Sequence, residues 1–114
     1  MLASLRGLRA AGTVVRVSAN VNMTLRVDGL RSSDTAFTVG RAMDQLFRDE
    51  GMTDDVRLDE EPQGAMVWTT PWPLIIAGNV KRWRGQFEDK IRSAVAAAAP
   101  ELPVTVEWEY PDGP

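Results

Sequence analysis

Apolar and polar residues alternate from Thr13 to Asp28 (TVVRVSANVNMTLRVD), the most regular pattern in the chain. Because successive side chains of a strand point to opposite faces, this alternation predicts a long strand with one apolar and one polar face. The apolar face needs a cover, which the rest of the chain must supply. Its members are Val15, Val17, Ala19, Val21, Met23, Leu25 and Val27.

Two later segments carry apolar residues at the three- and four-residue spacing of a helix. The first is predicted to begin at Ser33 as its N-cap and to end at Gly51 in the left-handed C′ position. The second opens at Gly78-Asn79, and Pro100 stops it. The apolar stripes are Ala36, Val39, Gly40, Met43, Leu46 and Phe47 in the first helix, and Val80, Trp83, Phe87, Ile91, Val95 and Ala98 in the second.

Three shorter segments have strand patterns. Residues 56–59 and 65–70 flank a turn at 60–64 (EEPQG), so they are expected to form a hairpin. Residues 71–77 (PWPLIIA) are expected to be a loop folded against the core, because two prolines interrupt them. Residues 104–110 alternate again and predict the last strand.

The order strand, helix, strand, strand, helix, strand predicts an α+β domain. Right-handed crossovers on this order give a four-stranded antiparallel sheet with both helices packed on one face. The arrangement resembles the ferredoxin-like βαββαβ fold with strand order 4-1-3-2. That resemblance rests on element order, spans about residues 13–110 and carries no functional motif, since the fold hosts many unrelated activities.

The chain length of 114 residues suits a single domain, expected over residues 13–110. Residues 1–12 are expected to be a flexible arm, in which Leu2, Leu5 and Leu8 alternatively line a short helix, and residues 111–114 a short tail. No apolar run is long enough for a membrane span or a signal peptide, which predicts a cytoplasmic protein with no membrane partner. Eleven arginines against two lysines point to a GC-rich, bacterial genome.

The chain contains no histidine and no cysteine, which excludes imidazole catalysis, thiolate nucleophiles and Cys/His zinc sites. It has neither a GxSxG motif nor a glycine-rich phosphate loop. The acidic residues between 54 and 61 match no cation-binding loop, and charges on an edge strand explain them more simply. We therefore expect no cofactor, no metal and no enzymatic activity; an enzyme using carboxylates is the remote alternative.

The polar face of the first strand is the first candidate for a binding surface. A solvated, salt-bridged face is the simpler interpretation. However, residues 65–70 (AMVWTT) next to it are apolar on both sides, which indicates that something covers part of the open face. The candidates are the N-terminal arm, the loop that carries Trp72, or a second copy of the protein. Whether Met66 and Trp68 or Ala65 and Val67 face the helices is left open. The candidate partner-binding residues are Arg16, Asn20, Asn22, Arg26, Trp68 and Trp72.

The start of the second helix is a second candidate, because cations gather there beside free backbone N–H groups. The candidate anion-binding residues are Asn79, Lys81, Arg82 and Arg84. Plain exposure, or pairing with the acidic residues 59–61, is the competing interpretation. A net charge of −3 and a central strand without aromatics disfavour a nucleic-acid partner without excluding one.

These features together favour a small non-catalytic protein-binding or assembly module that self-associates through the open sheet face. The partner is then the protein itself or another protein. The alternative is a nucleic-acid or anion-binding accessory protein that uses the local Arg/Lys patch. A strong salt dependence of binding would distinguish the second from the first.

Overall fold

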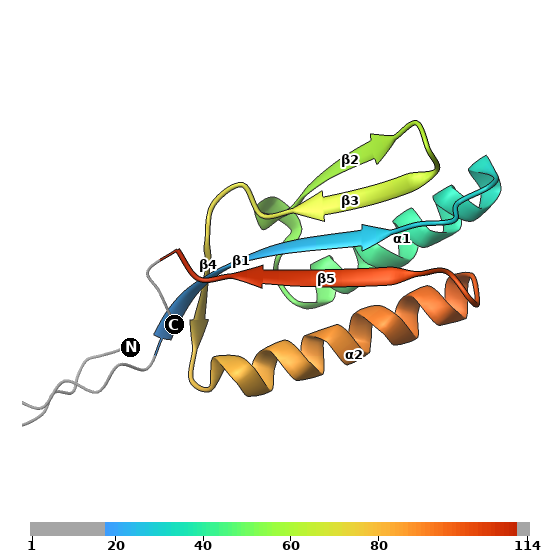
Figure 1. Ribbon diagram of the computed structural model, residues 1–114. Coiled ribbons are helices and arrows are strands. Elements are labelled where there is room, and N and C mark those ends of the chain that lie inside the picture. The colour runs from blue at the N-terminus through green and yellow to red at the C-terminus, as the bar shows by residue number, and fades with distance from the viewer. Residues whose placement is uncertain (1–17, 112–114) are drawn as a thin grey trace, which may run out of the picture.

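The computed structural model describes residues 18–111, and its sheet is built around β1 (Ser18–Val27), the long blue strand in Figure 1. Four side chains on its apolar face are at most 1% exposed, namely Val21, Met23, Leu25 and Val27. The half-buried strand that the alternation predicts is therefore present. The predicted arm at 1–12, residues 13–17 of the predicted strand and the end of the predicted tail lie outside the described residues.

Two α-helices, a short 3-10 turn and four further strands follow β1. They are α1 (Ser33–Asp49), η1 (Thr53–Asp55), β2 (Arg57–Glu61), β3 (Ala65–Thr69), β4 (Leu74–Ala77), α2 (Val80–Ala98) and β5 (Val104–Glu109).

All strand pairings are antiparallel, and β1 takes part in three of them. Its second half pairs with β3 and with β5, and β2 pairs with β3. Its first half pairs with β4, so that Val21 lies opposite Leu74 and Ser18 opposite Ala77. The α+β prediction with two helices and an open antiparallel sheet is confirmed. The sheet has five strands, however, so its topology and strand count differ from those of the four-stranded ferredoxin-like arrangement, although the fold is compatible with it.

The fifth strand, β4, replaces the loop that was expected at residues 71–77. The reason is the length of β1: β3 pairs only with Thr24–Val27, which leaves backbone groups earlier in β1 in need of partners. Thr70 continues the contact, because its N–H donates to Met23 O and its Oγ1 accepts from Met23 N. After Pro73 the chain returns to β1 and satisfies the remaining groups as β4.

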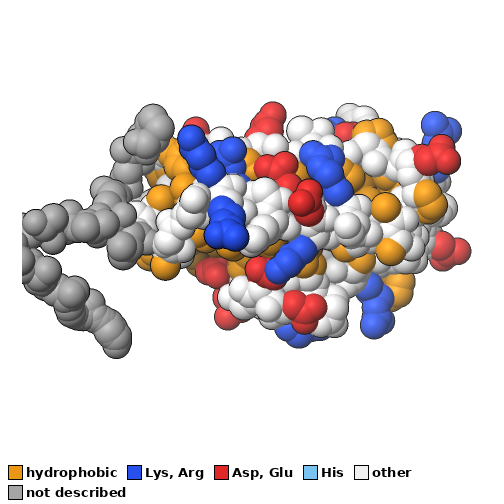
Figure 2. Space-filling model, turned by 90° about the horizontal axis from the view of Figure 1, so that it is seen from below, with side chains coloured by type: hydrophobic (Ala, Val, Ile, Leu, Met, Phe, Trp, Pro, Cys, Tyr) orange, Lys and Arg blue, Asp and Glu red, His pale blue; other side chains and the backbone are white. Residues whose placement is uncertain are grey.

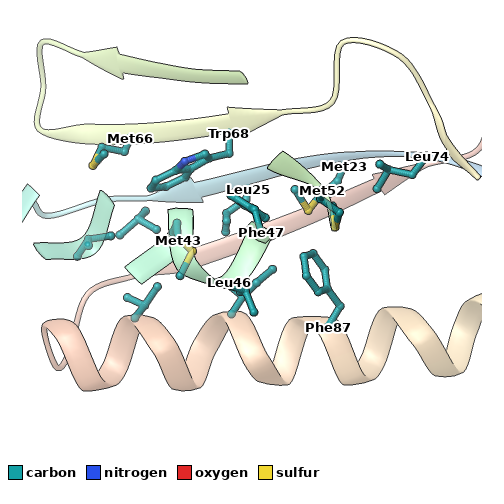
Figure 3. Packing of buried hydrophobic residues seen from close by; sticks show 14 of the residues in the cluster. Met23, Leu25, Met43, Leu46, Phe47, Met52, Met66, Trp68, Leu74 and Phe87 are labelled. Atoms are coloured by element: carbon teal, nitrogen blue, oxygen red, sulfur yellow. The ribbon is translucent and has the colours of Figure 1, made fainter. Parts of the chain in front are cut away.

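Both helices cover the apolar face of β1 and share one core. Val39, Met43, Leu46 and Phe47 of α1 pack with Phe87, Ile91 and Val95 of α2 in this cluster. Met66 and Trp68 point from β3 toward the same helices, as Figure 3 shows, which answers the question left open by the sequence. Each fully buried large apolar side chain contributes about 1.5–3 kcal/mol to stability.

The helix ends follow the predicted signals, with one shift. The N-cap of α1 is Ser32 rather than Ser33, because the Ser32 side chain accepts the hydrogen bond from Thr35 N. Gly51 has a φ of +71° after the C-terminus of α1, and Asn79 caps α2 by accepting from Arg82 N, as expected.

Candidate functional site

An ion-pair bridge spans one end of the open sheet face, which is the surface formed by the polar side of β1 and its neighbours. Arg26 Nε donates to the Asp28 carboxylate at 3.0 Å, and Arg26 Nη1 lies 2.9 Å from Glu61 Oε1. Arg26 lies opposite Val67 of β3. Glu61 of β2 lies opposite Ala65, which precedes Val67 by two residues in β3. The Arg26 side chain therefore crosses β3 to reach Glu61. The hydrogen bond with Asp28 raises the pKa of Arg26.

This bridge accounts for the apolar residues on the outer side of β3. Ala65 is 2% exposed and Val67 is half-buried, and the methylene stem of Arg26 crosses the strand that carries both. The apolar outer side of β3, which motivated an interface on the open face, is thus covered to a large extent within the chain.

Trp68 does not belong to the open face, and its assignment to a partner surface there is corrected. It lies opposite Leu25 on the helix side of the sheet and is 2% exposed. Its ring points into the core between β3 and the helices in Figure 3. The sequence left this ambiguous because β3 is apolar on both sides, so its alternation carried no information about which side is buried.

The other predicted residues of the open face are placed as follows. Asn22 Oδ1 accepts a hydrogen bond from the Thr70 hydroxyl at 3.1 Å, and Asn20 lies opposite Ile75 of β4. Arg16 lies outside the described residues. A hollow of about 530 Å³ on this face is lined by Asn22, Thr24, Glu107, Trp108 and Glu109. The face is mostly polar, and several of its side chains have partners within the chain.

Trp72 is 58% exposed, and Ile75 of β4 is 76% exposed. Ile75 is on the open-face side of β4, since Asn20 lies opposite it. Sequence reasoning missed Ile75, because residues 74–77 were expected to form a loop and LIIA shows no alternation.

The predicted anion patch does not converge on one point. The Asn79 side chain is used as the cap of α2, and Lys81 and Arg82 are exposed. Arg84 is turned toward β5, where its Nη1 donates to the Tyr110 hydroxyl at 2.6 Å and its guanidinium lies over the rings of Trp108 and Tyr110. Figure 2, a view from the side of α2, shows basic and acidic side chains interspersed over the surface.

A groove between α1 and β2 is the site that sequence reasoning did not identify; we call it the α1–β2 groove. Phe37 of α1 is 66% exposed and Leu58 of β2 is 38% exposed, and both line it. Met66 lines it as well, and it approaches so closely that a Cβ on Gly40 would lie 3.3 Å from Met66 Cε. Its central hollow measures about 360 Å³ and is lined by Ser33, Ala36, Phe37, Gly40, Arg41, Asp44, Leu58, Glu60 and Met66.

The groove follows the whole of β2. On one side of the central hollow, beyond Leu58, a hollow of about 200 Å³ reaches Val56 and Thr53. On the other side, beyond Glu60, a hollow of about 260 Å³ reaches Pro62 and Gly64. β2 pairs with β3 on one side, and in Figure 1 its other side is the edge of the sheet away from α2. A free strand edge and a row of hollows, apolar at its centre, therefore lie side by side.

Carboxylates and arginines both border this groove. Among the described residues, no ion pair involves Asp44 or Glu60 in the groove or Asp59 on the outer side of β2. Arg41 lies over the ring of Phe37, with its Cζ 5.7 Å from the ring centroid, and Arg57 stands at the start of β2. The three hollows are lined by the acidic residues Asp44, Glu60 and Glu61 and by the basic residues Arg31, Arg41 and Arg48, so the groove has an apolar centre and mixed charge around it.

The signal for the groove in the sequence is weak. Phe37 follows Ala36 directly and falls outside the apolar stripe of α1, while Leu58 reads as an ordinary core residue of an alternating strand. Only the packing of α1 shows that both stay exposed.

Within the part of the chain that the structure describes, no group of three or more Asp or Glu residues is arranged to hold a metal ion. In the same part, no helix has the length and apolar character that crossing a membrane requires.

Comparisons of the chain with protein-family models, with curated proteins and with solved structures find no match.

Proposed function

We propose that this chain is a non-catalytic protein-binding module that takes an extended segment of a protein partner into the α1–β2 groove. The observation that carries the proposal is the pair Phe37 and Leu58, two exposed apolar side chains beside the free edge of β2. Exposed apolar surface next to an unpaired strand is the arrangement that binds a peptide as an added strand.

The chemistry of the groove specifies the kind of segment that fits. A strand added to β2 satisfies the backbone groups at its free edge and points every second side chain toward the helix. Those side chains meet Leu58 and Phe37 and should be apolar. The intervening side chains lie on the outer side of β2 beside Arg57 and Asp59, so the groove selects for alternating apolar residues rather than for one sign of charge.

This proposal keeps the protein-binding function expected from the sequence but moves its surface. Self-association through the open sheet face has lost its main support, because Trp68 is in the core and Arg26 crosses β3. Among residues 18–111, Trp72 and Ile75 are the large apolar side chains that stay exposed on or near that face.

The test is a selection of binders from a library of random extended peptides against the whole chain. We expect selected peptides to alternate apolar and polar residues. Replacing Phe37→Glu should weaken their binding at least about tenfold, because it places a charge in the apolar wall of the groove. Ile75→Glu, an equally drastic change at an exposed site on β4, is the matched control and should leave binding unchanged.

Peptides that bind the wild type and Phe37→Glu equally well would contradict the proposal. A loss of binding in Ile75→Glu but not in Phe37→Glu would return the binding surface to the open sheet face.

A further inference from the structure

We infer that the extended segment bound beside the α1–β2 groove is β2 of a second copy of this chain, so that two copies pair edge to edge as a two-fold dimer. This inference rests on the proposed function and names its partner. Two antiparallel β2 strands join the two sheets into one, and each strand satisfies the free backbone groups of the other. The side chains of residues 57–59 carry the inference.

These three residues alternate between the two sides of the sheet. Leu58 lies opposite the buried Trp68 and is therefore on the helix side, whereas Arg57 and Asp59 are on the outer side. All three are exposed, and no ion pair among the described residues involves Arg57 or Asp59. A strand added to this edge therefore meets an apolar side chain on one side and two charges of opposite sign on the other.

A two-fold pairing centred on Leu58 makes this pattern complementary to itself. In this register Leu58 lies opposite Leu58 of the second copy, on the helix side of both sheets. Arg57 lies opposite Asp59 of the second copy, and the two-fold axis repeats that contact. Directly opposite residues of antiparallel strands are close neighbours, and opposite charges there stabilise the pairing. The interface thus contains one apolar contact and two pairs of opposite charges.

The two nearest registers that keep the helices of both copies on one side of the sheet bring like charges together. Centring the pairing on Arg57 places two arginines opposite each other, and centring it on Asp59 does the same with two aspartates. The second of these registers also offers Glu61 to Arg57, but Glu61 is already paired with Arg26. The charges of β2 therefore select the register centred on Leu58.

The mixed charge of the groove lining supports the same pairing. Val56 precedes β2 with an extended backbone, and in this register it lies opposite Glu60 of the second copy. Val56 lines one hollow with Arg48, and Glu60 lines another with Phe37. Glu60 of each copy thus approaches Arg48 of the other, and Phe37 approaches Val56. A surface that meets its own copy needs both signs of charge, because a surface of one sign repels itself.

The edge of β5 lacks this complementarity. Among the described strands β5 pairs only with β1, so its other edge is free as well. Its charged residues are Glu107 and Glu109, and it contains no cation. Opposite charges therefore meet in no register of β5 with its own copy, which leaves β2 as the edge that recognises itself.

The experiment is a charge-reversal cycle on the full chain, measured by sedimentation velocity. We expect the wild type to pass from monomer to dimer, and not beyond, as its concentration rises. Arg57→Glu and Asp59→Arg should each weaken dimerisation at least about tenfold, because each places like charges opposite each other twice. Both substitutions in one chain should restore the dimer, and so should an equal mixture of the two single variants. Lys81→Glu makes the same charge change as Arg57→Glu at an exposed site of α2 and should leave the dimer unchanged.

Cysteine cross-linking tests the register without changing a charge. The chain has no cysteine, so Leu58→Cys introduces a single thiol. In the dimer the two thiols lie opposite each other on adjacent strands, within the range of a disulfide. Mild oxidation should therefore give a covalent dimer of Leu58→Cys much faster than of the control Lys81→Cys. Circular dichroism and the urea midpoint establish that each variant is folded.

Three results would each overturn the pairing of β2 with its own copy: a wild type that is monomeric throughout the concentration range, a combined charge variant that stays monomeric, or equal cross-linking of the two cysteine variants. If library peptides then still bind in a Phe37-dependent way, the groove binds a different protein and the proposed function stands. If those peptides also bind Phe37→Glu unchanged, the proposed function fails as well.

Discussion

Two tryptophans four positions apart, Trp68 and Trp72, have opposite environments. Trp68 lies at 2% exposure in the core, on the side of β3 that faces the helices. Trp72 follows Pro71 in the bend before β4 and is 58% exposed. The contribution of each indole to stability therefore depends on its burial and not on residue type alone.

We expect Trp68→Ala to lower the free energy of unfolding by about 3–5 kcal/mol, because it leaves a cavity in a packed core. Trp72→Ala should cost less than about 1 kcal/mol, since most of that side chain is in solvent. Urea unfolding followed by circular dichroism measures both. If Trp68→Ala does not fold, Trp68→Phe tests the same point with a smaller loss. Equal losses at the two positions would contradict the assignment of Trp68 to the core.

At the scale of elements, the turn from β2 to β3 is held by its contact with the chain after β1. Gly64 has a φ of +82°, and Leu30 N donates to Gly64 O at 2.9 Å. A Cβ on Gly64 would lie 2.6 Å from Leu30 O. Gly78, before α2, has a similar φ of +85° but nothing within 4 Å of its added Cβ.

Comparing alanine substitutions at these two glycines separates the energetic cost of backbone strain from that of steric crowding. Both Gly64→Ala and Gly78→Ala should lose about 1–2 kcal/mol for the left-handed conformation. Gly64→Ala should lose at least about 1 kcal/mol more, because its Cβ overlaps a backbone carbonyl and relief disturbs the Leu30 hydrogen bond. The measurement is the difference between the urea midpoints of the two variants. Equal midpoints would contradict a steric clash between the added Cβ of residue 64 and the Leu30 carbonyl.

At the scale of the molecule, the charges are dispersed and do not form a basic surface. The chain carries a net charge of −3, Arg26 is held by Asp28 and Glu61, and Arg84 is turned toward Tyr110. Lys81 and Arg82 remain as exposed cations in the first turns of α2. This arrangement gives little support to a phosphate-binding surface.

We therefore expect no binding of a fluorescently labelled single-stranded oligonucleotide at physiological salt, measured by anisotropy. Binding that falls steeply as salt rises, and that is lost on reversing the charges of Lys81 and Arg82, would instead support the nucleic-acid alternative.

Local sequence patterns determined the main elements of this protein. Strict alternation over β1, helical stripes in α1 and α2, and the signals at Gly51 and Asn79 each act between residues close in the chain. Such signals need no knowledge of distant partners, so they could be read directly.

Only the tertiary structure decided the rest, because those features depend on contacts between distant segments. Leu74–Ala77 becomes a strand because the first half of β1 needs backbone partners there. Trp68 is buried because its side of β3 meets the helices. The α1–β2 groove exists because the packing of α1 leaves Phe37 and Leu58 exposed beside a free strand edge, and no pattern along the chain encodes that relation.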